Sequence, residues 1–542
     1  MSRRRKFWGW GWEDERANPL ELQAVEGMIE HLLGMPEITV TPPPRLDQLA
    51  LRAPRLSAPA ALAQLTSDVP YERAAHSYGK SYRDLVRALS GDFSNPPDLV
   101  AFPETELDVT RLLDWCTSAR VAAIPYGGGS SVCGGVEPDV GEDFAGTLAI
   151  DLSRMQKVLE VDRQSLAARI QAGVFGPDLE AQLRPHGLTL RHYPQSFEFS
   201  TLGGWIATRS GGHFATLFTH VDELVESLRV VTPSGSIATR RLPGDGAGPS
   251  PERLFIGSEG ILGIITEAWM RVFERPRFRG AASALFADFA SGARAVQRLV
   301  QSGLYPENCR LLDAREAMLN GAAGGEHAVL LLGFESPDHA PKGRLARAIE
   351  LCRDSGGEVP DSSIRSSDLG AGERSGAAGA WRGAFLRAPY LRDELVARGV
   401  FVETFETAIT WDRFEALTSA VLAAAHGVAR ELGAGSTAIA TCRITHAYRD
   451  GAAPYFTVIC PARRGAELQQ WALMKAAITD AMLDHGATVT HHHAVGRDFR
   501  PWYARQVPVA FQRALAAAKG ALDPSGVLNP GVLLSKSATL GG

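Results

Sequence analysis

Short apolar runs alternate with longer amphipathic segments between residues 97 and about 275. Residues 121–125 are apolar throughout and predict a buried strand, and a helix is predicted before it, capped by Thr105 and ending at Ala119. Further strands are predicted at residues 100–103, 147–151, 168–172, 228–232 and 236–238. Strands mixed with helices, but without a regular βαβ repeat, indicate an α+β fold.

The pattern divides the chain into four parts. Residues 1–95 predict a helical, loop-rich N-terminal extension, and residues 96–275 the α+β domain. A boundary at Arg275-Pro276-Arg277 opens a third part, 276–490, with predicted strands at 328–333, 400–406 and 455–460. Residues 491–542 form a C-terminal segment. Residues 321–325 and 362–379 are rich in glycine, serine and alanine and predict loops.

Composition narrows the class of protein. A chain of 542 residues exceeds what one core organises, and a net charge of −5 gives no electrostatic reason to expect nucleic acid. The six cysteines are scattered without a CxxC motif, so no residue is assigned to a metal. No apolar run reaches the roughly 20 residues that span a bilayer. A cytoplasmic protein, in peripheral contact with a membrane at most, is the expectation.

The N-terminus allows two interpretations. A basic run, Arg3-Arg4-Arg5-Lys6, stands beside Trp8, Trp10 and Trp12. Basic and aromatic side chains together can dock at an anionic membrane surface. The alternative is that the tryptophans pack against the protein itself.

Three glycine-rich loops follow predicted strands or lie close to them. They occupy residues 125–131, 194–212 and 257–266. Glycines let backbone N–H groups converge on a phosphate, and serines and threonines add donors. None of the loops matches the Walker or GxGxxG pattern. One such loop is more often just a turn, but three spread over this length can surround a dinucleotide.

The loops resemble those of the vanillyl-alcohol-oxidase/p-cresol-methylhydroxylase superfamily of FAD proteins, over residues 97–270. The resemblance implies a two-subdomain FAD-binding domain, an α/β cap domain over the flavin, and noncovalent FAD, because no histidine lies in the first loop. His192 and His213 keep covalent attachment open as an alternative. The implied cofactor-binding residues are Pro125, Tyr126, Gly127, Gly128, Gly129, Ser130 and Ser131; Gln195, Ser196, Phe197, Glu198, Phe199, Ser200, Thr201, Gly204, Thr208, Arg209, Ser210 and Gly211; and Glu259, Gly260, Ile261, Leu262, Gly263, Ile264 and Ile265.

Motifs along nearly the whole chain resemble the alkyldihydroxyacetonephosphate synthase family. They are residues 8–11, 200–205, 310–313, 403–407, 411–413, 441–445 and the run His491-His492-His493 followed by Ala494-Val495-Gly496. The resemblance implies FAD-dependent exchange, without net redox, of the acyl group of acyl-dihydroxyacetone phosphate for a fatty alcohol, a step of ether lipid synthesis. The flavin would hold the three-carbon unit during the exchange. The resemblance also implies a homodimer and an apolar tunnel for the long chains.

Six residues carry the implied chemistry. Tyr455 matches the family's catalytic tyrosine, and its phenol can act as a base if cations or the flavin lower its pKa. Arg392 matches an arginine expected at the substrate phosphate, although it could instead form a surface pair with Asp393 or Glu394. The histidines would activate the alcohol and help to hold the phosphate. These residues, with a supporting arginine, are Tyr455, His491, His492, His493, Arg392 and Arg310.

The triplet also admits a metal site or a solvated loop. Side chains alternate along a strand, so at most two of the three histidines should enter one pocket. Gln195 and Tyr126 depart from the family pattern without removing an essential chemical group. The alternative function on the same fold is an FAD-linked 2-hydroxy-acid dehydrogenase or oxidase, and a non-catalytic flavin-binding protein is a more distant one.

Overall fold

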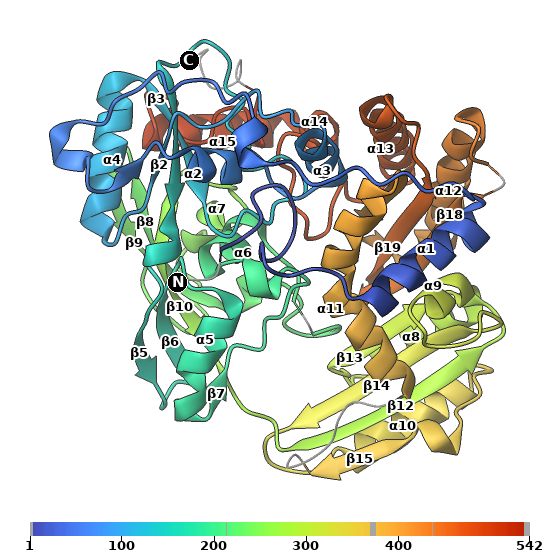
Figure 1. Cartoon of the computed structure of the whole chain (residues 1–542). Helices are drawn as coiled ribbons and strands as arrows, with labels where there is room; N and C mark the ends of the chain where they lie inside the picture. Colours follow the sequence, from blue (N-terminus) through green and yellow to red (C-terminus); the bar gives the residue numbers. More distant parts are fainter. Residues whose placement is uncertain (1–3, 213, 369–375, 436, 536–542) are drawn as a thin grey trace.

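Three large β-sheets and one two-stranded sheet are present in the computed structural model, which describes residues 4–212, 214–368, 376–435 and 437–535. A four-stranded and a five-stranded sheet pack side by side and are called here the two-sheet unit. An eight-stranded sheet with its helices, called the cap, lies beside that unit (Figure 1). The mixed strand and helix content confirms the α+β prediction.

The four-stranded sheet holds the first glycine loop at its edge. Its order is β1 (Thr66–Ser67), β2 (Leu99–Ala101), β4 (Gly146–Asp151) and β3 (Val121–Tyr126), and β2, β4 and β3 are parallel. The predicted helix is confirmed as α4 (Glu106–Ala119), with the Thr105 side chain accepting the N–H of Asp108. The loop that follows β3 is the first glycine loop.

The five-stranded sheet carries the other two loops. Its antiparallel order is β5 (Val158–Asp162), β6 (Ala167–Gln171), β10 (Ile264–Arg271), β8 (Val225–Thr232) and β9 (Gly235–Ala238). The two sheets share one hydrophobic core, which includes Ile124, Leu148, Ile170 and Leu228. The second loop contains α6 (Leu202–Thr208), and the third loop leads into β10. Short elements complete the unit: α2 (Pro70–Ala75), α5 (Gly176–Leu183), β7 (Leu188–Thr189), α7 (Glu252–Phe255) and β11 (Phe273–Glu274).

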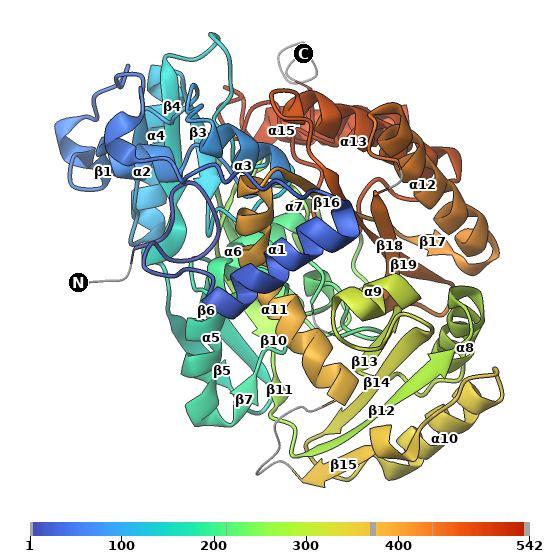
Figure 2. The same ribbon diagram turned by 45° about the vertical axis from the view of Figure 1, so that its right-hand side comes forward.

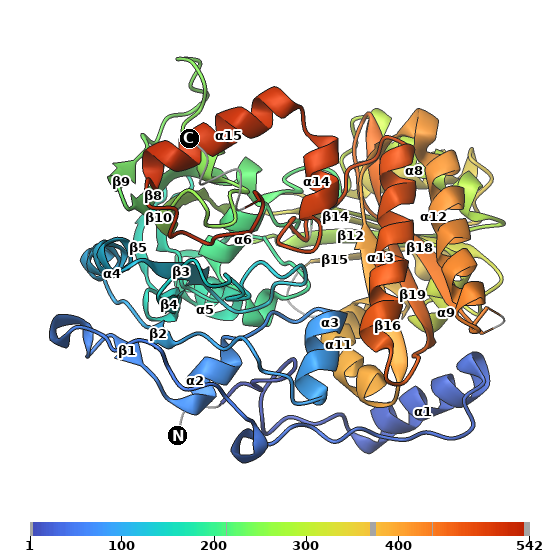
Figure 3. The same ribbon diagram turned by 90° about the horizontal axis from the view of Figure 1, so that it is seen from above.

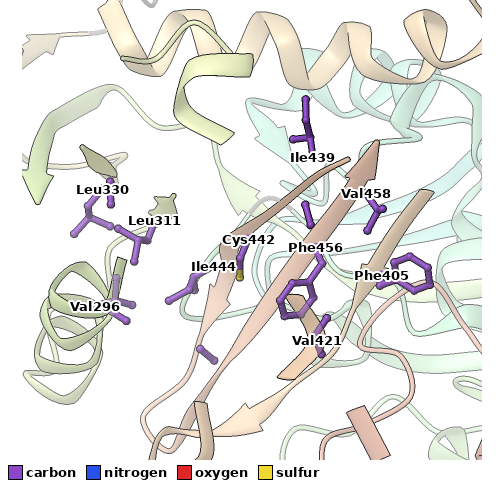
Figure 4. Packing of buried hydrophobic residues seen from close by; sticks show 14 of the residues in the cluster. Val296, Leu311, Leu330, Phe405, Val421, Ile439, Cys442, Ile444, Phe456 and Val458 are labelled. Atoms are coloured by element: carbon purple, nitrogen blue, oxygen red, sulfur yellow. The ribbon is translucent and has the colours of Figure 1, made fainter. Parts of the chain in front are cut away.

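The cap sheet is antiparallel throughout. Its order is β15 (Arg365–Asp368), β12 (Phe278–Phe286), β14 (Ala328–Ser336), β13 (Asn308–Leu312), β18 (Ile439–Ala447), β19 (Gly451–Pro461) and β16 (Val400–Glu406), with β17 (Ile409–Thr410) paired to β19. Helices cover its core: α8 (Phe289–Gln301), α9 (Ala314–Leu319), α10 (Lys342–Arg353), α12 (Trp411–Glu431) and α13 (Glu467–Asp484). In Figure 4, Phe456 of β19 lies beside Val421 of α12, and Leu311 of β13 beside Val296 of α8. This apolar packing fixes the strands that carry the candidate catalytic residues.

The N-terminal extension wraps the boundary between the cap and the two-sheet unit. Its helix α1 (Pro19–Leu33) lies against α11 (Gly376–Ala397) of the cap (Figure 2), and α3 (Tyr82–Leu89) contacts α11 as well. The indole of Trp10 is only 6% exposed, and the ring of Trp12 lies 5.5 Å from that of Phe199. These two tryptophans therefore pack within the chain, as the second interpretation expects.

The C-terminal segment runs back from the cap to the two-sheet unit. After α13 come the histidine triplet, α14 (Arg500–Gln506) and α15 (Val509–Leu522), seen from above in Figure 3. The Ala123 N–H of β3 then donates to the Val527 carbonyl at 2.8 Å. The triplet is thus held between the two parts of the molecule.

Some expectations were wrong. Residues 362–379 were predicted as a loop, yet they contain β15, which pairs with β12, and the start of α11; residues 369–375 lie outside the described residues. Strands β5, β12, β13 and β18 had not been predicted. The division into four parts stays a prediction. Within the described part of the chain, no helix is long and apolar enough to cross a membrane.

Candidate functional site

The three glycine loops meet in space. A Cβ on Gly128 would collide with the Phe199 carbonyl of the second loop, and one on Gly127 with the Thr201 hydroxyl. A Cβ on Gly260 of the third loop would come within 2.8 Å of the Pro125 ring. Only glycine permits these approaches, and the result is a backbone-lined cradle of the kind that holds a dinucleotide phosphate.

The predicted cofactor residues divide by where their side chains lie. Ile261, Leu262 and Ile264 are buried in the hydrophobic core, so they offer only backbone to a ligand. The Tyr126 hydroxyl donates to the Ala75 carbonyl at 3.0 Å, and its ring lies 4.2 Å from that of His76. The assignment of the cofactor residues stays a prediction.

Side chains of the second loop are engaged with the protein as well. The Ser200 hydroxyl accepts the indole N–H of Trp205 at 2.6 Å, and the Glu198 carboxylate accepts the Tyr390 hydroxyl of α11 at 2.6 Å. The second loop is therefore tied to the cap helix α11. Gly211, at the end of this loop, lies so close to His492 that a Cβ there would be 3.2 Å from its ring.

Glu259 ties the third loop to the segment that follows the triplet. Its carboxylate accepts the N–H groups of Val495 at 2.9 Å and Gly496 at 2.7 Å. Burial raises its pKa to about 7, although these two hydrogen bonds act in the opposite direction. Glu259 was predicted as a cofactor residue, and the structure gives its side chain a different contact, one that positions the triplet beside the loops.

The triplet is organised around the carboxylate of Glu406, at the end of β16. The N–H groups of His491, His492 and His493 donate to it at 2.6, 3.1 and 2.9 Å, and the Thr490 hydroxyl donates at 2.5 Å. The triplet is an irregular bend, so strand alternation, the reason given for separating its side chains, does not apply. The bend around a buried anion separates them instead.

Two of the three imidazoles face Tyr455 on β19. The Tyr455 ring is near-parallel to that of His492, with centroids 6.1 Å apart and an interplanar angle of 24°, and it meets His493 edge-on at 5.7 Å. Burial lowers the pKa of His492, and it lowers the pKa of His493 to about 3, in both cases against the charge of Glu406. Both imidazoles are therefore neutral near pH 7 and able to accept a proton.

Tyr455 is buried against a cation. The Arg443 guanidinium lies 3.8 Å from the ring centroid and is itself ion-paired with Glu316. Burial raises the pKa of the Tyr455 phenol, while the charges of Arg443 and, less strongly, Arg392 lower it. Since burial outweighs the cations in this structure, Tyr455 keeps its proton near pH 7.

His491 points away from Tyr455 into a second group of polar side chains. Its Nε2 lies 2.6 Å from the Tyr448 hydroxyl and 3.0 Å from Nε2 of His220, and its Nδ1 lies 3.0 Å from Nδ1 of His492. Nitrogens of His446, His491 and His492 lie within 4.8 Å of one another, close enough to share a metal ion. The triplet thus connects the Tyr455 side to His220.

The two candidate arginines occupy different positions. Arg392, on α11, pairs with Glu403 of β16 at 2.9 Å, rather than with Asp393 or Glu394. Its charge reaches both Tyr455 and His493, because it contributes to the pKa of each. Arg310, on β13, is 4% exposed and donates to Asn308 at 2.9 Å. Its charge contributes to lowering the pKa of His446, behind the effects of burial and of His492. Its supporting role stays a prediction.

Of the two histidines that could attach the flavin, His192 lies among the described residues. His192 is 1% exposed, and its Nε2 lies 2.7 Å from the Ser210 hydroxyl in the second loop. Burial lowers its pKa to about 3. His213 lies outside the described residues.

Several residues of this site had escaped the sequence analysis. Glu406 and Arg443 fall in motifs quoted for the family resemblance, but no role had been assigned to them. A buried acid at the end of a strand could have suggested an anchor for backbone donors. His220 and Tyr448 carry no local signal, because only the fold brings them to His491.

Comparison with known proteins identifies the class of protein. Residues 97–240 match the FAD binding domain family, and residues 275–533 match the family of FAD linked oxidases, C-terminal domain. The structure of p-cresol methylhydroxylase, 13% identical, superposes with a TM-score of 0.65 over 95% of this chain and 97% of that one, which shows the fold. The chain is therefore a flavoprotein with a two-subdomain FAD-binding fold, and its cofactor is FAD.

Two further comparisons show the particular family to which the chain belongs. An alkyldihydroxyacetonephosphate synthase from Dictyostelium discoideum is 32% identical over 488 residues, which are 85% of this chain and 77% of that one. A solved structure of an alkyldihydroxyacetonephosphate synthase, 27% identical, has a TM-score of 0.79 and covers 97% of this chain and 98% of that one. The chain belongs to the alkyldihydroxyacetonephosphate synthase family.

Proposed function

We propose that this enzyme exchanges the acyl group of acyl-dihydroxyacetone phosphate for a fatty alcohol and so makes alkyl-dihydroxyacetone phosphate, with no net redox change. The observation that carries the proposal is the packing of two neutral imidazoles against the Tyr455 phenol beside the glycine loops, His492 stacked on its ring and His493 edge-on to it. The reaction needs two proton acceptors within one pocket, and this arrangement provides them.

Each residue has a role that follows from its position. Tyr455 removes and returns the proton next to the substrate carbonyl, and Arg443 and Arg392 favour the phenolate that this role requires. His492 or His493 takes the proton of the incoming alcohol. FAD, bound noncovalently by the glycine loops, would supply an electrophilic ring for this chemistry.

Arg392 binds the substrate phosphate in this proposal. Its pairing with Glu403 leaves other donors of the guanidinium for a phosphate, because that group has five N–H bonds. Arg310 supports the site through His446 and does not touch the substrate. The homodimer and the peripheral membrane contact stay predictions.

Proton balance gives His491 a role. An ester and an alcohol yield an ether, a carboxylate and one proton, and that proton has to leave a buried site. His492, His491 and then His220 or Tyr448 form a continuous chain of contacts of 3.0 Å or less. His220 is only partly buried. We propose that the proton of the alcohol leaves by this relay.

Loss of both His220 and Tyr448, the outer residues of the relay, should slow turnover. We expect His220→Gln or Tyr448→Phe alone to lower kcat less than threefold, because the other branch remains, and the double variant to lower it about tenfold. The KM for the alcohol should not change, while the solvent deuterium isotope effect on kcat should rise and a small diffusible imidazole buffer should restore part of the rate. A double variant with the wild-type isotope effect would contradict the relay.

Chelators test whether the cluster of His446, His491 and His492 carries protons or binds a metal ion. Proton carriers need a free nitrogen lone pair, which a bound metal ion would occupy. We therefore expect EDTA to leave the rate of ether formation unchanged and added Zn²⁺ to inhibit it reversibly. The rate is measured in the same preparation before and after dialysis against chelator. A rate that falls on dialysis and returns with metal would show that the cluster works as a metal site.

The absorbance spectrum of the flavin distinguishes the proposed exchange from the alternative function, a 2-hydroxy-acid dehydrogenase. A 2-hydroxy-acid dehydrogenase reduces its flavin on adding substrate, and an exchange enzyme has no net electron transfer. We expect the absorbance of the bound FAD to persist with D-lactate or glycolate under anaerobic conditions, with no reduction of an electron acceptor. Bleaching of the flavin by a small hydroxy acid would favour the dehydrogenase.

A further inference from the structure

An arginine-rich pocket lies where the chain crosses from the two-sheet unit to the cap. The crossing segment runs between β11 and β12 (Figure 2). The pocket has a volume of about 480 Å³, and five arginines line it: Arg163, Arg191, Arg275, Arg277 and Arg279. Tyr455 and the triplet are not part of its wall, so it is a separate feature from the site described above.

Carboxylates offset only part of this charge. Glu335 is shared by Arg191 and Arg279, and Glu180 pairs with Arg275 at 3.2 Å. Glu274 is the one acidic residue among those that line the pocket. Five guanidinium groups face these three carboxylates, so the pocket keeps a positive charge that attracts anions.

Arg191 and Arg277 of this pocket differ in burial. Arg191 is 7% exposed and has a backbone φ of +61°, a conformation that a residue with a Cβ adopts only at a cost. Burial lowers its pKa, and the charges of Glu180 and Glu307 together with the Tyr193 hydroxyl act in the opposite direction. Arg277 is exposed at the pocket, and no ion pair within the described ranges involves its side chain. A buried and an exposed guanidinium together can hold a phosphate from two sides.

A second arginine pocket provides a comparison within the same molecule. Its lining includes Arg169, Arg229 and Arg241, around a volume of about 190 Å³. Each of these arginines is paired: Arg229 with Glu106 at 2.8 Å, Arg241 with Glu226 and Asp162, and Arg169 with Glu160 and Glu267. That pocket is neutralised by the protein itself, whereas the one at the crossing segment is not.

We propose that the pocket at the crossing segment binds a phosphate monoester. Guanidinium groups recognise phosphate oxygens in pairs, and the volume admits a group larger than phosphate alone. The same chemistry is present in a free phosphate ester and in the headgroup of phosphatidic acid. The binding does not depend on the proposed acyl exchange.

Titration of the FAD-loaded full chain with glycerol 3-phosphate tests the free ligand. The proposed active site also takes a phosphate, so the wild type is expected to bind two equivalents. Arg277→Gln should weaken one of them at least about tenfold and keep the other, whereas Arg392→Gln should weaken the other one. Arg229→Gln, the matched loss of a neutralised arginine, should bind as the wild type. If the proposed active site fails, only the Arg277-dependent equivalent remains.

Sedimentation with phosphatidylcholine vesicles, with and without phosphatidic acid, tests the headgroup. Binding that needs phosphatidic acid and is lost in Arg277→Gln, but kept in Arg229→Gln, assigns the pocket to a lipid. Binding of glycerol 3-phosphate alone assigns it to a free ester. Arg277 lies on the surface, and an unchanged unfolding temperature confirms that the variant is folded. If Arg277→Gln behaves as the wild type in both assays, the proposal is overturned.

Discussion

Replacing Tyr455 by phenylalanine should lower the rate of ether formation by about 10² to 10⁴, the range that a positioned acid or base contributes. The ring stays stacked on His492, because only the hydroxyl is removed, and Arg443 stays over its face. The variant should therefore keep its FAD absorbance and its unfolding temperature. The substrate proton next to the carbonyl exchanges with deuterated solvent, and the rate of this exchange should fall by the same factor.

Tyr305→Phe is the control for this variant. Tyr305 is 39% exposed, and the same loss of a hydroxyl there should leave activity unchanged. A Tyr455→Phe enzyme with wild-type turnover would remove Tyr455 from the mechanism. A variant that loses ether formation but still exchanges the substrate proton would move the role of base to the histidines.

Replacing Glu406 by glutamine should lower both stability and activity. Three backbone N–H groups and the Thr490 hydroxyl point at the carboxylate, and an amide would turn a donor towards one of them. We expect the free energy of unfolding to fall by about 3 kcal/mol and turnover to fall about 100-fold, because the triplet loses its shape. Denaturant unfolding and the ether assay measure the two effects. The matched variant Thr490→Val keeps the carboxylate and should cost no more than about 1.5 kcal/mol.

The pKa of Glu406 predicts how the stability of the protein depends on pH. The positive charges that His492 and His493 acquire at low pH, together with the hydrogen bonds around the carboxylate, outweigh burial and lower the pKa of Glu406 from 4.5 to about 2 in the folded protein. A group with a lowered folded pKa stabilises the protein above its unfolded pKa. This contribution should be complete above about pH 5 and lost as the pH falls towards 2. Glu406→Gln should lose less stability than the wild type over that interval, and equal losses in the two proteins would contradict the anchoring role.

The sequence predicts the local features of this molecule better than its long-range contacts. The helix after Thr105 and the strands around the first glycine loop follow from capping and apolar runs, which act between neighbours in the chain. Strands β13 and β18 were missed because they are short or fully buried, so they lack an alternating pattern. The predicted loop at residues 362–379 failed because pairing with β12 outweighs the composition of β15.

The site also combines residues that are recognisable in the sequence with contacts that only the fold creates. Tyr455 and the triplet are recognisable because their residue types and motifs lie together in the sequence. The anchoring of the triplet by Glu406 and Glu259 depends on tertiary contacts, and so does the neighbourhood of His491, His220 and Tyr448. No spacing in the chain indicates those contacts. The sequence analysis expected at most two of the three histidines in one pocket because side chains alternate along a strand, whereas the structure has a bend around the Glu406 carboxylate instead of a strand.

The most direct test of the central claim uses the purified, FAD-loaded protein with palmitoyl-dihydroxyacetone phosphate and labelled hexadecanol. The account predicts labelled alkyl-dihydroxyacetone phosphate and an equal amount of palmitate, with no consumption of oxygen or of an added electron acceptor. Absence of the labelled ether, together with reduction of the flavin by small 2-hydroxy acids, would contradict it.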